Sequence, residues 1–407
     1  MRPIGELSTL IVAKRCRTSV FHALFLRLTV IGISLTVTLL LLEGVARLIP
    51  LWPDQISDVD SELGWSHVPG AKGWWVNIAT PLEFRTYVQI SSQGLRDREF
   101  EPEKAAGVTR ILLLGDSMVD GLEVPLENTF AKQLEHLFRE SGRNVEVING
   151  GHYGYGTDQE LLFYRLRGHK YRPDVVVLCF TTNDIEDNLA TNSLASKPFF
   201  VLAPDAALQL ENFPVDTSAE QDSSKVSLFK RTKEMLYAHS KLYRFAGYQI
   251  KRQLAELGDP LARIGLNEAV NPESSSSGLF QEVTSDYHER GWTLTQALIL
   301  ELEKEVESRG SKFVVAIMPV TLQFTPLAEA QGMDLIKWNR RVMQLCSEVD
   351  LECIDLYPIF RSLIAQDQST RLFYPRDGHP NSEGHLHIAE ALYGYLTTHI
   401  SMLGNVP

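Results

Sequence analysis

Strand-like and helix-like segments alternate along most of this chain, and this alternation constrains the fold more than any other feature of the sequence. Short apolar runs rich in β-branched residues are each followed by a longer segment with helical spacing. The apolar runs do not follow a period of two, as expected for strands that are covered on both faces. The sequence therefore predicts a parallel sheet between two layers of helices. The predicted strands are residues 110–114, 145–149, 174–180, 312–318 and 351–356, and the predicted helices are residues 127–139, 157–169, 225–257, 292–308, 335–348 and 382–398.

The organisation around this sheet is predicted from shifts in composition and pattern. Residues 50–105 read as a lead-in with some β structure, in which residues 84–90 alternate like an edge or hairpin strand. Residues 106–400 form the main domain. A helical insertion at about 190–300 interrupts it, with a flexible serine-rich loop at residues 274–278, and we interpret the insertion as a cap that sets substrate choice.

Composition excludes some classes of protein. Of the 407 residues 44% are hydrophobic, enough for a large core, and the formal net charge of −12 argues against a nucleic-acid partner.

Cys346 and Cys353 flank a predicted helix-to-strand turn, and the sequence leaves open whether they pair. Cys16 and Cys179 read as unpaired, and Cys179 as a small core residue. Because no cluster of cysteine and histidine has metal-ligand spacing, we expect no metal and no other cofactor.

The N-terminal region predicts a membrane anchor. Residues 24–46 are almost wholly apolar and, as a helix, match the thickness of a bilayer. Basic residues precede the apolar core, which favours a cytoplasmic segment at residues 1–23 and an extracytoplasmic main domain. We therefore predict a single-pass signal-anchor helix in the cell membrane. A cleaved signal peptide is the alternative, since Gly44-Val45-Ala46 fits a cleavage site.

Several polar segments fall where the active groups of such sheets gather, beyond the carboxyl ends of the strands. Ser117, in Gly115-Asp116-Ser117, places a hydroxyl and a free backbone N–H at a strand-to-helix turn. The alternative is a plain helix N-cap. In the glycine-rich segment 150–154, the N–H of Gly154 is a candidate donor to an oxyanion, against the alternative of an ordinary glycine turn.

Asn183, Asp377 and His379 supply the remaining groups that a nucleophilic serine needs. The amide of Asn183 follows the third strand and is a candidate third donor to the oxyanion, with an Asx-turn as the alternative. His379 would accept the serine proton and Asp377 would orient the imidazole, although the two could also belong to a polar turn. Their order and their common place at one edge of the predicted sheet favour a serine-nucleophile site.

These segments resemble the sequence blocks of the SGNH/GDSL hydrolase family, over about residues 108–190 and 312–398. The resemblance implies a flavodoxin-like three-layer α/β/α fold with a central parallel sheet, and ester hydrolysis or acyl transfer without a metal. Within this resemblance, Ser117 matches the nucleophile, and Asp377 and His379 match the acid and the base. The oxyanion hole is matched by Ser117, Gly154 and Asn183. Two blocks depart from the family pattern, because one residue instead of two separates Asp377 from His379, and Thr181 replaces a glycine. The stretch 94–97 also resembles a segment of anchored relatives, and we assign it no chemistry.

The predicted function is that of a serine ester hydrolase acting on O-acyl esters, chiefly acetyl esters, of envelope or exported carbohydrate. An O-acetyltransferase would use the same residues and would need an acyl donor delivered by a partner protein. A carbohydrate-binding or assembly protein that has kept the fold is the non-catalytic alternative. Trp65, Trp74 and Trp75 are candidates for a sugar-binding surface, with simple packing as the other interpretation.

Overall fold

The computed structural model describes residues 5–48, 53–77, 82–216, 228–256, 278–325, 333–367 and 369–403. Contacts divide the chain into two compact units, one formed by Met1–Leu51 and Val226–Asp259, the other by Trp52–Lys225 and Pro260–Pro407. The lead-in therefore belongs to the same unit as the α/β body. The helical part of the insertion groups with the N-terminal helix instead, and most of the serine-rich loop lies outside the described residues.

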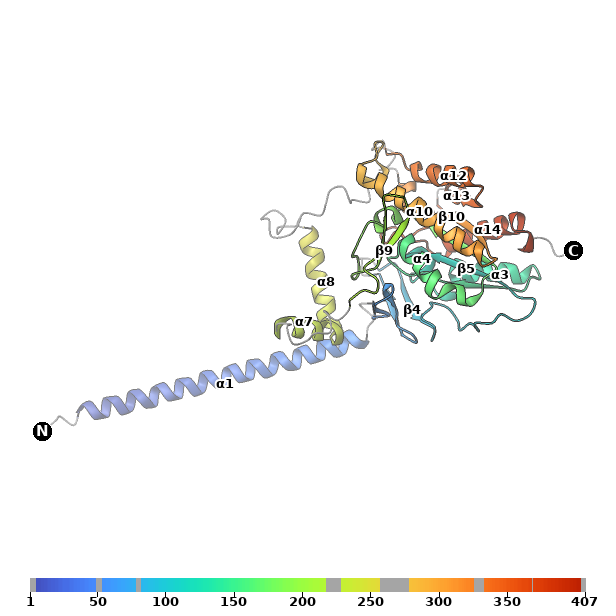
Figure 1. Ribbon diagram of the computed structural model, residues 1–407. Helices are drawn as coiled ribbons and strands as arrows, with labels where there is room; N and C mark the ends of the chain where they lie inside the picture. Colours follow the sequence, from blue (N-terminus) through green and yellow to red (C-terminus); the bar gives the residue numbers. More distant parts are fainter. Residues whose placement is uncertain are drawn as a thin grey trace. The chain divides into compact units, whose positions relative to one another are not determined.

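A five-stranded parallel sheet forms the centre of the larger unit (Figure 1). From one edge of the sheet to the other, its strands lie in the order β6-β5-β7-β10-β11. When the five strands are numbered by their order along the chain, this order is 2-1-3-4-5. This is the flavodoxin-like order of a doubly wound sheet, so the predicted fold class is confirmed. The bounds are β5 Thr109–Gly115, β6 Val145–Asn149, β7 Val175–Phe180, β10 Lys312–Ile317 and β11 Cys353–Asp355.

Helices cover both faces of this sheet. Successive residues of β5 belong to opposite buried clusters, with Leu112 and Leu114 on one face and Ile111 and Leu113 on the other, because side chains alternate along a strand. The first face packs against α4 (Thr157–Leu166), α10 (Asp286–Ser308) and α12 (Lys337–Val349). The second packs against α3 (Phe130–Glu140), α13 (Tyr357–Gln366) and α14 (Ser382–His399). The unbroken apolar runs of the sequence are thus explained by burial on both sides.

The insertion is less helical than we predicted. The segment from Phe199 to Glu211 forms an antiparallel hairpin, β8 (Phe199–Leu202) and β9 (Leu208–Glu211), and α10 begins at Asp286 because the Ser285 hydroxyl caps its first turn. The hairpin was missed because each of its strands has only four residues, too few for a clear periodic pattern. The long helix predicted at 225–257 is divided into α7 (Leu228–His239) and α8 (Lys241–Glu256).

The lead-in consists of two small hairpins. Strand β1 (Ser57–Asp60) pairs with β2 (Gly64–His67), and β3 (Lys72–Val76) pairs with β4 (Arg85–Gln89). The alternating segment 84–90 is therefore one arm of a hairpin, as predicted. A small buried cluster joins β4 and the turn after Ser117; its members are Ile56, Val88, Ile90 and Leu122.

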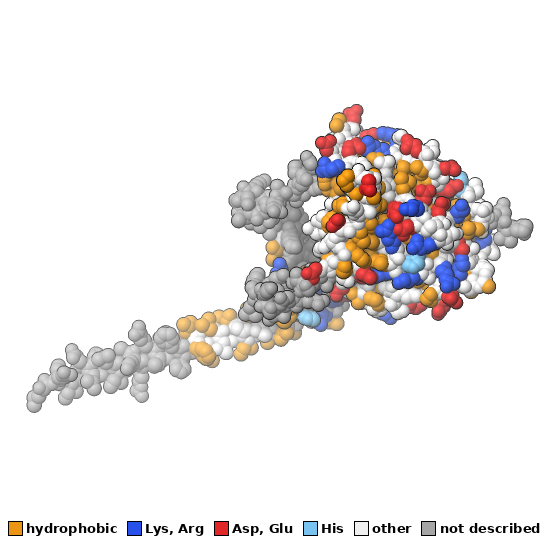
Figure 2. Space-filling view, viewed as in Figure 1, with side chains coloured by type: hydrophobic (Ala, Val, Ile, Leu, Met, Phe, Trp, Pro, Cys, Tyr) orange, Lys and Arg blue, Asp and Glu red, His pale blue; other side chains and the backbone are white. Residues whose placement is uncertain are grey.

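In the smaller unit, helix α1 runs from Gly5 to Leu48. Its segment Leu24–Leu48 has a mean hydropathy of 2.2, and most of its apolar side chains are exposed, as Figure 2 shows along this helix. This segment is long and apolar enough to cross a membrane, a property that a signal sequence shares. Near its end Glu43 accepts the backbone N–H groups of Lys241 and Leu242, so it caps the first turn of α8.

The cysteine pair that the sequence left open is a disulfide. Cys346 of α12 and Cys353 of β11 are bonded, with their Cα atoms 6.2 Å apart. Cys179 is buried in β7 as a free thiol, in agreement with its predicted place in the core. The bridge ties an outer helix to an edge strand of the sheet.

Candidate active site

The serine lies at a tight turn from β5 into the short helix α2 (Ser117–Asp120). The Asp116 carboxylate accepts the N–H of Met118 at 2.9 Å and so begins the helix. A Cβ atom at Gly115 would lie 2.2 Å from a methyl group of Val119, so only glycine lets the chain close here. Ser117 is partly exposed between buried neighbours, which presents its hydroxyl at the carboxyl end of the sheet.

Ser117, His379 and Asp377 form one hydrogen-bonded chain. His379 Nε2 lies 2.8 Å from Ser117 Oγ, and His379 Nδ1 lies 2.6 Å from Asp377 Oδ1. Gly378 between them has φ +92°, which turns the short loop so that both side chains face each other. The spacing of one residue between acid and base is therefore compatible with the hydrogen bonds that a nucleophilic triad requires.

The loop that carries the acid is supported by the lead-in, which the sequence did not connect with the site. Asn77 Nδ2 lies 3.5 Å from Asp377 Oδ2 and 3.3 Å from a carboxylate oxygen of Glu83. Glu83 accepts the backbone N–H groups of Arg376 and Asp377, each at 3.0 Å. No motif surrounds Asn77 or Glu83, so only the folded chain reveals their role.

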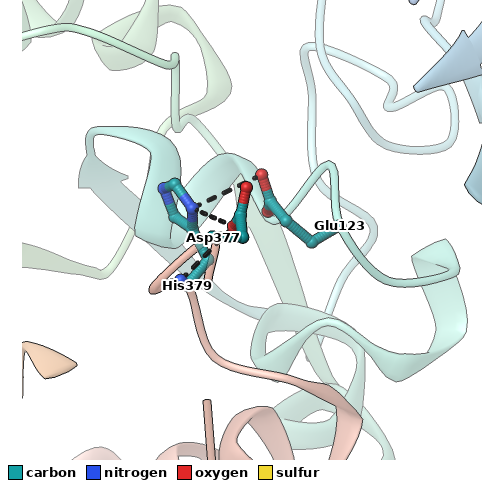
Figure 3. Close-up of side chains that lie close together, drawn as sticks. All are labelled: Glu123, Asp377 and His379. Carbon is teal, nitrogen blue, oxygen red and sulfur yellow. Dashed lines mark hydrogen bonds and ion pairs between the residues drawn. The ribbon is translucent and has the colours of Figure 1, made fainter. Parts of the chain in front are cut away.

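A second carboxylate approaches the base. Glu123 is buried, with Oε1 3.8 Å from His379 Nδ1 (Figure 3). Burial by itself lowers the pKa of the His379 imidazole, but the negative charges of Glu123 and Asp377 outweigh it and raise this pKa from 6.5 to about 9. Burial also raises the pKa of the Glu123 carboxyl above its ordinary value. Sequence reasoning missed Glu123, whose only signal is an acid six residues after the serine.

The same three side chains offer a geometry that a cation could use. One ligand atom each from Glu123, Asp377 and His379 lies within 4.8 Å of the other two. However, His379 Nδ1 already forms the hydrogen bond with Asp377. Metal ligation through that nitrogen and the triad hydrogen bond therefore exclude each other.

The predicted oxyanion donors differ in availability. Within the described ranges, the backbone N–H groups of Ser117 and Gly154 donate to no protein acceptor. In contrast, Asn183 Nδ2 lies 3.1 Å from Asp116 Oδ2 and 2.9 Å from Asp187 Oδ2. Both hydrogens of this amide are thus engaged in the structure, and the amide must release an acceptor before it can bind an oxyanion.

The glycine-rich loop after β6 is fastened to the nucleophile turn. The N–H of His152 donates to Gly115 O at 3.0 Å, and the N–H of Tyr153 donates to Asp120 Oδ2 at 3.1 Å. Asp120 also lies 3.1 Å from His67 Nε2 of the lead-in, and His152 Nε2 accepts the His67 N–H at 2.6 Å. The position of Gly154 is therefore set jointly by α2 and β2.

Buried carboxyl groups gather behind the amide of Asn183. Burial is the main cause that raises the pKa values of Asp116, Glu160 and Asp184, and it raises that of Asp187 to about 7. Neighbouring carboxylates raise the pKa values of Glu160, Asp184 and Asp187 further, because like charges disfavour ionisation. Near neutral pH this cluster therefore holds protons that isolated carboxyl groups would lose.

The segment 94–97, to which we assigned no chemistry, braces the site. The buried Arg96 guanidinium donates to the carbonyl groups of Asp120, Gly121 and Val124, just after the nucleophile helix. Asp97 Oδ2 accepts the N–H of Asn149 at the end of β6. These bonds fix the turn from which the nucleophile projects.

Two histidines of α14, His385 and His387, lie outside the triad. His385 is buried and accepts the N–H of Phe130 at 3.2 Å, and burial lowers its pKa to about 3. His387 pairs with Glu390 on the same helix at 2.8 Å. Both therefore have packing or surface roles.

Comparison with known proteins gives resemblances at low identity. No family model matches the chain, and no curated protein matches it. Among solved structures, an acetyl xylan esterase matches 70% of this chain and 98% of its own, at 12% identity and a TM-score of 0.39. A catalytic mutant of an acetylxylan esterase from Geobacillus stearothermophilus matches 73% and 96%, at 11% identity and a TM-score of 0.38. A psychrotrophic esterase from Pseudoalteromonas sp. matches 72% and 99%, at 12% identity and a TM-score of 0.35. At TM-scores this low, these matches carry no weight for the fold or the activity of the chain, which rest on its own geometry.

Proposed function

We propose that this chain is a serine ester hydrolase whose nucleophile is Ser117. The observation that carries the proposal is the continuous hydrogen-bonded chain from Ser117 Oγ through His379 to Asp377, with distances of 2.8 and 2.6 Å. Such a chain lets the imidazole remove the hydroxyl proton as the oxygen attacks a carbonyl carbon.

In the proposed mechanism the Ser117 oxygen forms a bond to the ester carbonyl carbon while its proton passes to His379 Nε2. The N–H groups of Ser117 and Gly154 stabilise the resulting oxyanion, together with Asn183 once its amide turns from a carboxylate. His379 then gives the proton to the departing alcohol, which leaves an acyl-enzyme. Water, activated by the same imidazole, releases the acid and restores the serine.

We further propose that the substrates are O-acyl esters, chiefly acetyl esters, of envelope or exported carbohydrate. Trp75 lies 5.6 Å from Tyr153, which precedes the oxyanion glycine, and both rings are partly exposed. Trp74 and Tyr87 form a second pair on the same hairpin, and such rings can stack on the apolar faces of sugars. Trp65 supports packing instead, since it is buried and donates to the Tyr153 carbonyl.

The proposed location is the outer side of a cell membrane, with the N-terminus in the cytoplasm. The basic residues before the apolar helix favour this orientation. The Cys346–Cys353 disulfide fits an oxidising compartment.

The test of the function is hydrolysis of p-nitrophenyl acetate by the full chain and by Ser117→Ala. We expect the wild type to turn over and the variant to be inactive. Wild-type-like turnover by the variant would remove Ser117 from its role. Mass spectrometry of products formed from an acetylated oligosaccharide, with a sugar acceptor present, separates hydrolysis from acetyl transfer. Binding of the glycan without turnover would favour the non-catalytic alternative.

A further inference from the structure

The buried carboxylate of Glu123 lies beside the triad. Its side chain is 4% exposed, and Oε2 has no partner among the residues that the structure describes. Buried polar groups are normally paired, because desolvation without compensation is costly. Glu123 is instead directed at the imidazole of His379 (Figure 3), where Oε1 lies 3.8 Å from Nδ1. This arrangement calls for a reason other than local stability.

The backbone around Glu123 is held by three other segments of the chain. Its carbonyl accepts the hydroxyl of Thr86 from β4 at 2.7 Å and that of Tyr374 at 3.4 Å. The carbonyl of Val124, the next residue, accepts the Arg96 guanidinium at 2.5 Å. The backbone position from which the Glu123 side chain projects is therefore fixed by the fold.

The two carboxylates near His379 act in different ways. Nδ1 has one hydrogen to donate, and at 2.6 Å Asp377 is its acceptor. The 3.8 Å to Glu123 is too long for a hydrogen bond, but two charges that far apart interact strongly in a buried site. Two further charged groups act on this pair: the negative charge of Asp116 raises the pKa of His379, and the positive charge of Arg96 lowers that of Glu123.

We propose that Glu123 is a second carboxylate for His379, which stabilises the imidazolium formed when the base takes the proton of Ser117. The inference rests on the proposed function. In this step the Ser117 O–H bond breaks, the proton binds Nε2, and Oγ bonds to the carbonyl carbon, whose π electrons move to its oxygen. The new positive charge is then balanced by Asp377 through a hydrogen bond and by Glu123 through space. Glu123 exchanges no proton and touches no reacting atom, so it is a positioning residue.

The Glu123→Gln variant removes the charge and keeps the shape. Because a nearby anion favours the protonated imidazole, its loss lowers the pKa of His379 from about 9. The acid limb of the kcat/KM profile, which reports the free base, should therefore move to lower pH by about one unit or more. The alkaline plateau of kcat should fall about tenfold, since the imidazolium in the transition state has lost a counter-charge.

Two further variants control for folding and for general charge effects. Glu123→Asp retains the charge, so its acid limb should stay closer to that of the wild type than the limb of Glu123→Gln. Glu127→Gln removes the same charge from an exposed position four residues away, and its profile should match the wild type. An acid limb in Glu123→Gln that coincides with the wild type, or an equal shift in Glu127→Gln, would overturn the inference.

A double-variant cycle gives an independent test. With Glu123 in place, Asp377→Asn should keep a measurable rate of p-nitrophenyl acetate hydrolysis. Adding Glu123→Gln should then reduce that rate by a larger factor than it does in the wild type, because the last counter-charge is gone. Equal factors in both backgrounds would contradict the inference. If Ser117→Ala is inactive and Glu123→Gln reduces the rate by the same factor in both backgrounds, only the role of Glu123 is rejected. If Ser117→Ala is active, the proposed function itself is rejected.

Discussion

The two sides of Ser117 are built differently. On the base side, the hydroxyl, the imidazole and the Asp377 carboxylate are already joined by hydrogen bonds, and the lead-in supports the acid through Asn77. On the proposed oxyanion side the N–H groups of Ser117 and Gly154 have no acceptor in the described part of the chain, but the amide of Asn183 is bound to two carboxylates. The proton-transfer half of the site is thus assembled in advance. In the proposed mechanism, the side-chain half of the oxyanion hole becomes complete only when a developing negative charge competes for that amide.

The largest effect is expected from breaking the assembled side. His379→Ala removes the base, so kcat for p-nitrophenyl acetate should fall by about 10⁴-fold or more, as for the loss of a triad member in other enzymes. His387→Ala, in the following helix α14, where His387 pairs with Glu390, is the matched control and should behave like the wild type. Substantial activity in His379→Ala would show that another group accepts the serine proton.

A smaller loss is expected on the oxyanion side. Asn183→Ala should lower kcat about 100-fold while KM changes little, because the amide contributes mainly to the transition state. Steady-state kinetics measure both values, and Asn144→Ala, at an exposed asparagine before β6, serves as the control. An unchanged kcat would mean that the amide stays with its carboxylates and that the two backbone N–H groups suffice.

The pH dependence of the unfolding free energy tests whether the carboxyl cluster behind Asn183 holds protons. Burial raises the pKa of Asp187 to about 7, above its unfolded value, so its contribution to stability is present at low pH and is lost as pH rises from about 4 to 7. Asp187→Asn should therefore gain stability over the wild type as pH rises from 5 to 8, by roughly 1–4 kcal/mol. Urea unfolding at both pH values checks this. A stability difference that does not vary with pH would show that Asp187 ionises normally.

The smallest effect concerns a part of the fold away from the triad chemistry. Replacing Cys346 and Cys353 together by serine removes the disulfide that closes a short loop. This should lower the free energy of unfolding by about 2 kcal/mol. The hydrolysis rate at 25 °C should stay unchanged, because β11 and α12 contribute no side chain to the triad. Thermal unfolding and initial rates test the two statements, and loss of activity without loss of stability would contradict them.

The sequence predicts the sheet and the residues of the triad, but not what surrounds them. The strands could be recognised because both of their faces are buried, and Ser117 and His379 because each lies next to a predicted strand or helix end. Glu123, Asn77 and Glu83 could not be found, because their importance depends on contacts between segments far apart in the sequence. The engagement of Asn183 with Asp187 depends in the same way on side-chain packing.

The most direct test of the central claim is covalent labelling of the full chain by a fluorophosphonate, with the modified residue located by peptide mass spectrometry. A serine activated by His379 attacks the phosphorus, so the account predicts a single adduct on Ser117. Labelling should be abolished in Ser117→Ala and strongly slowed in His379→Ala. An adduct on another serine, or undiminished labelling of Ser117 without the imidazole, would contradict the account.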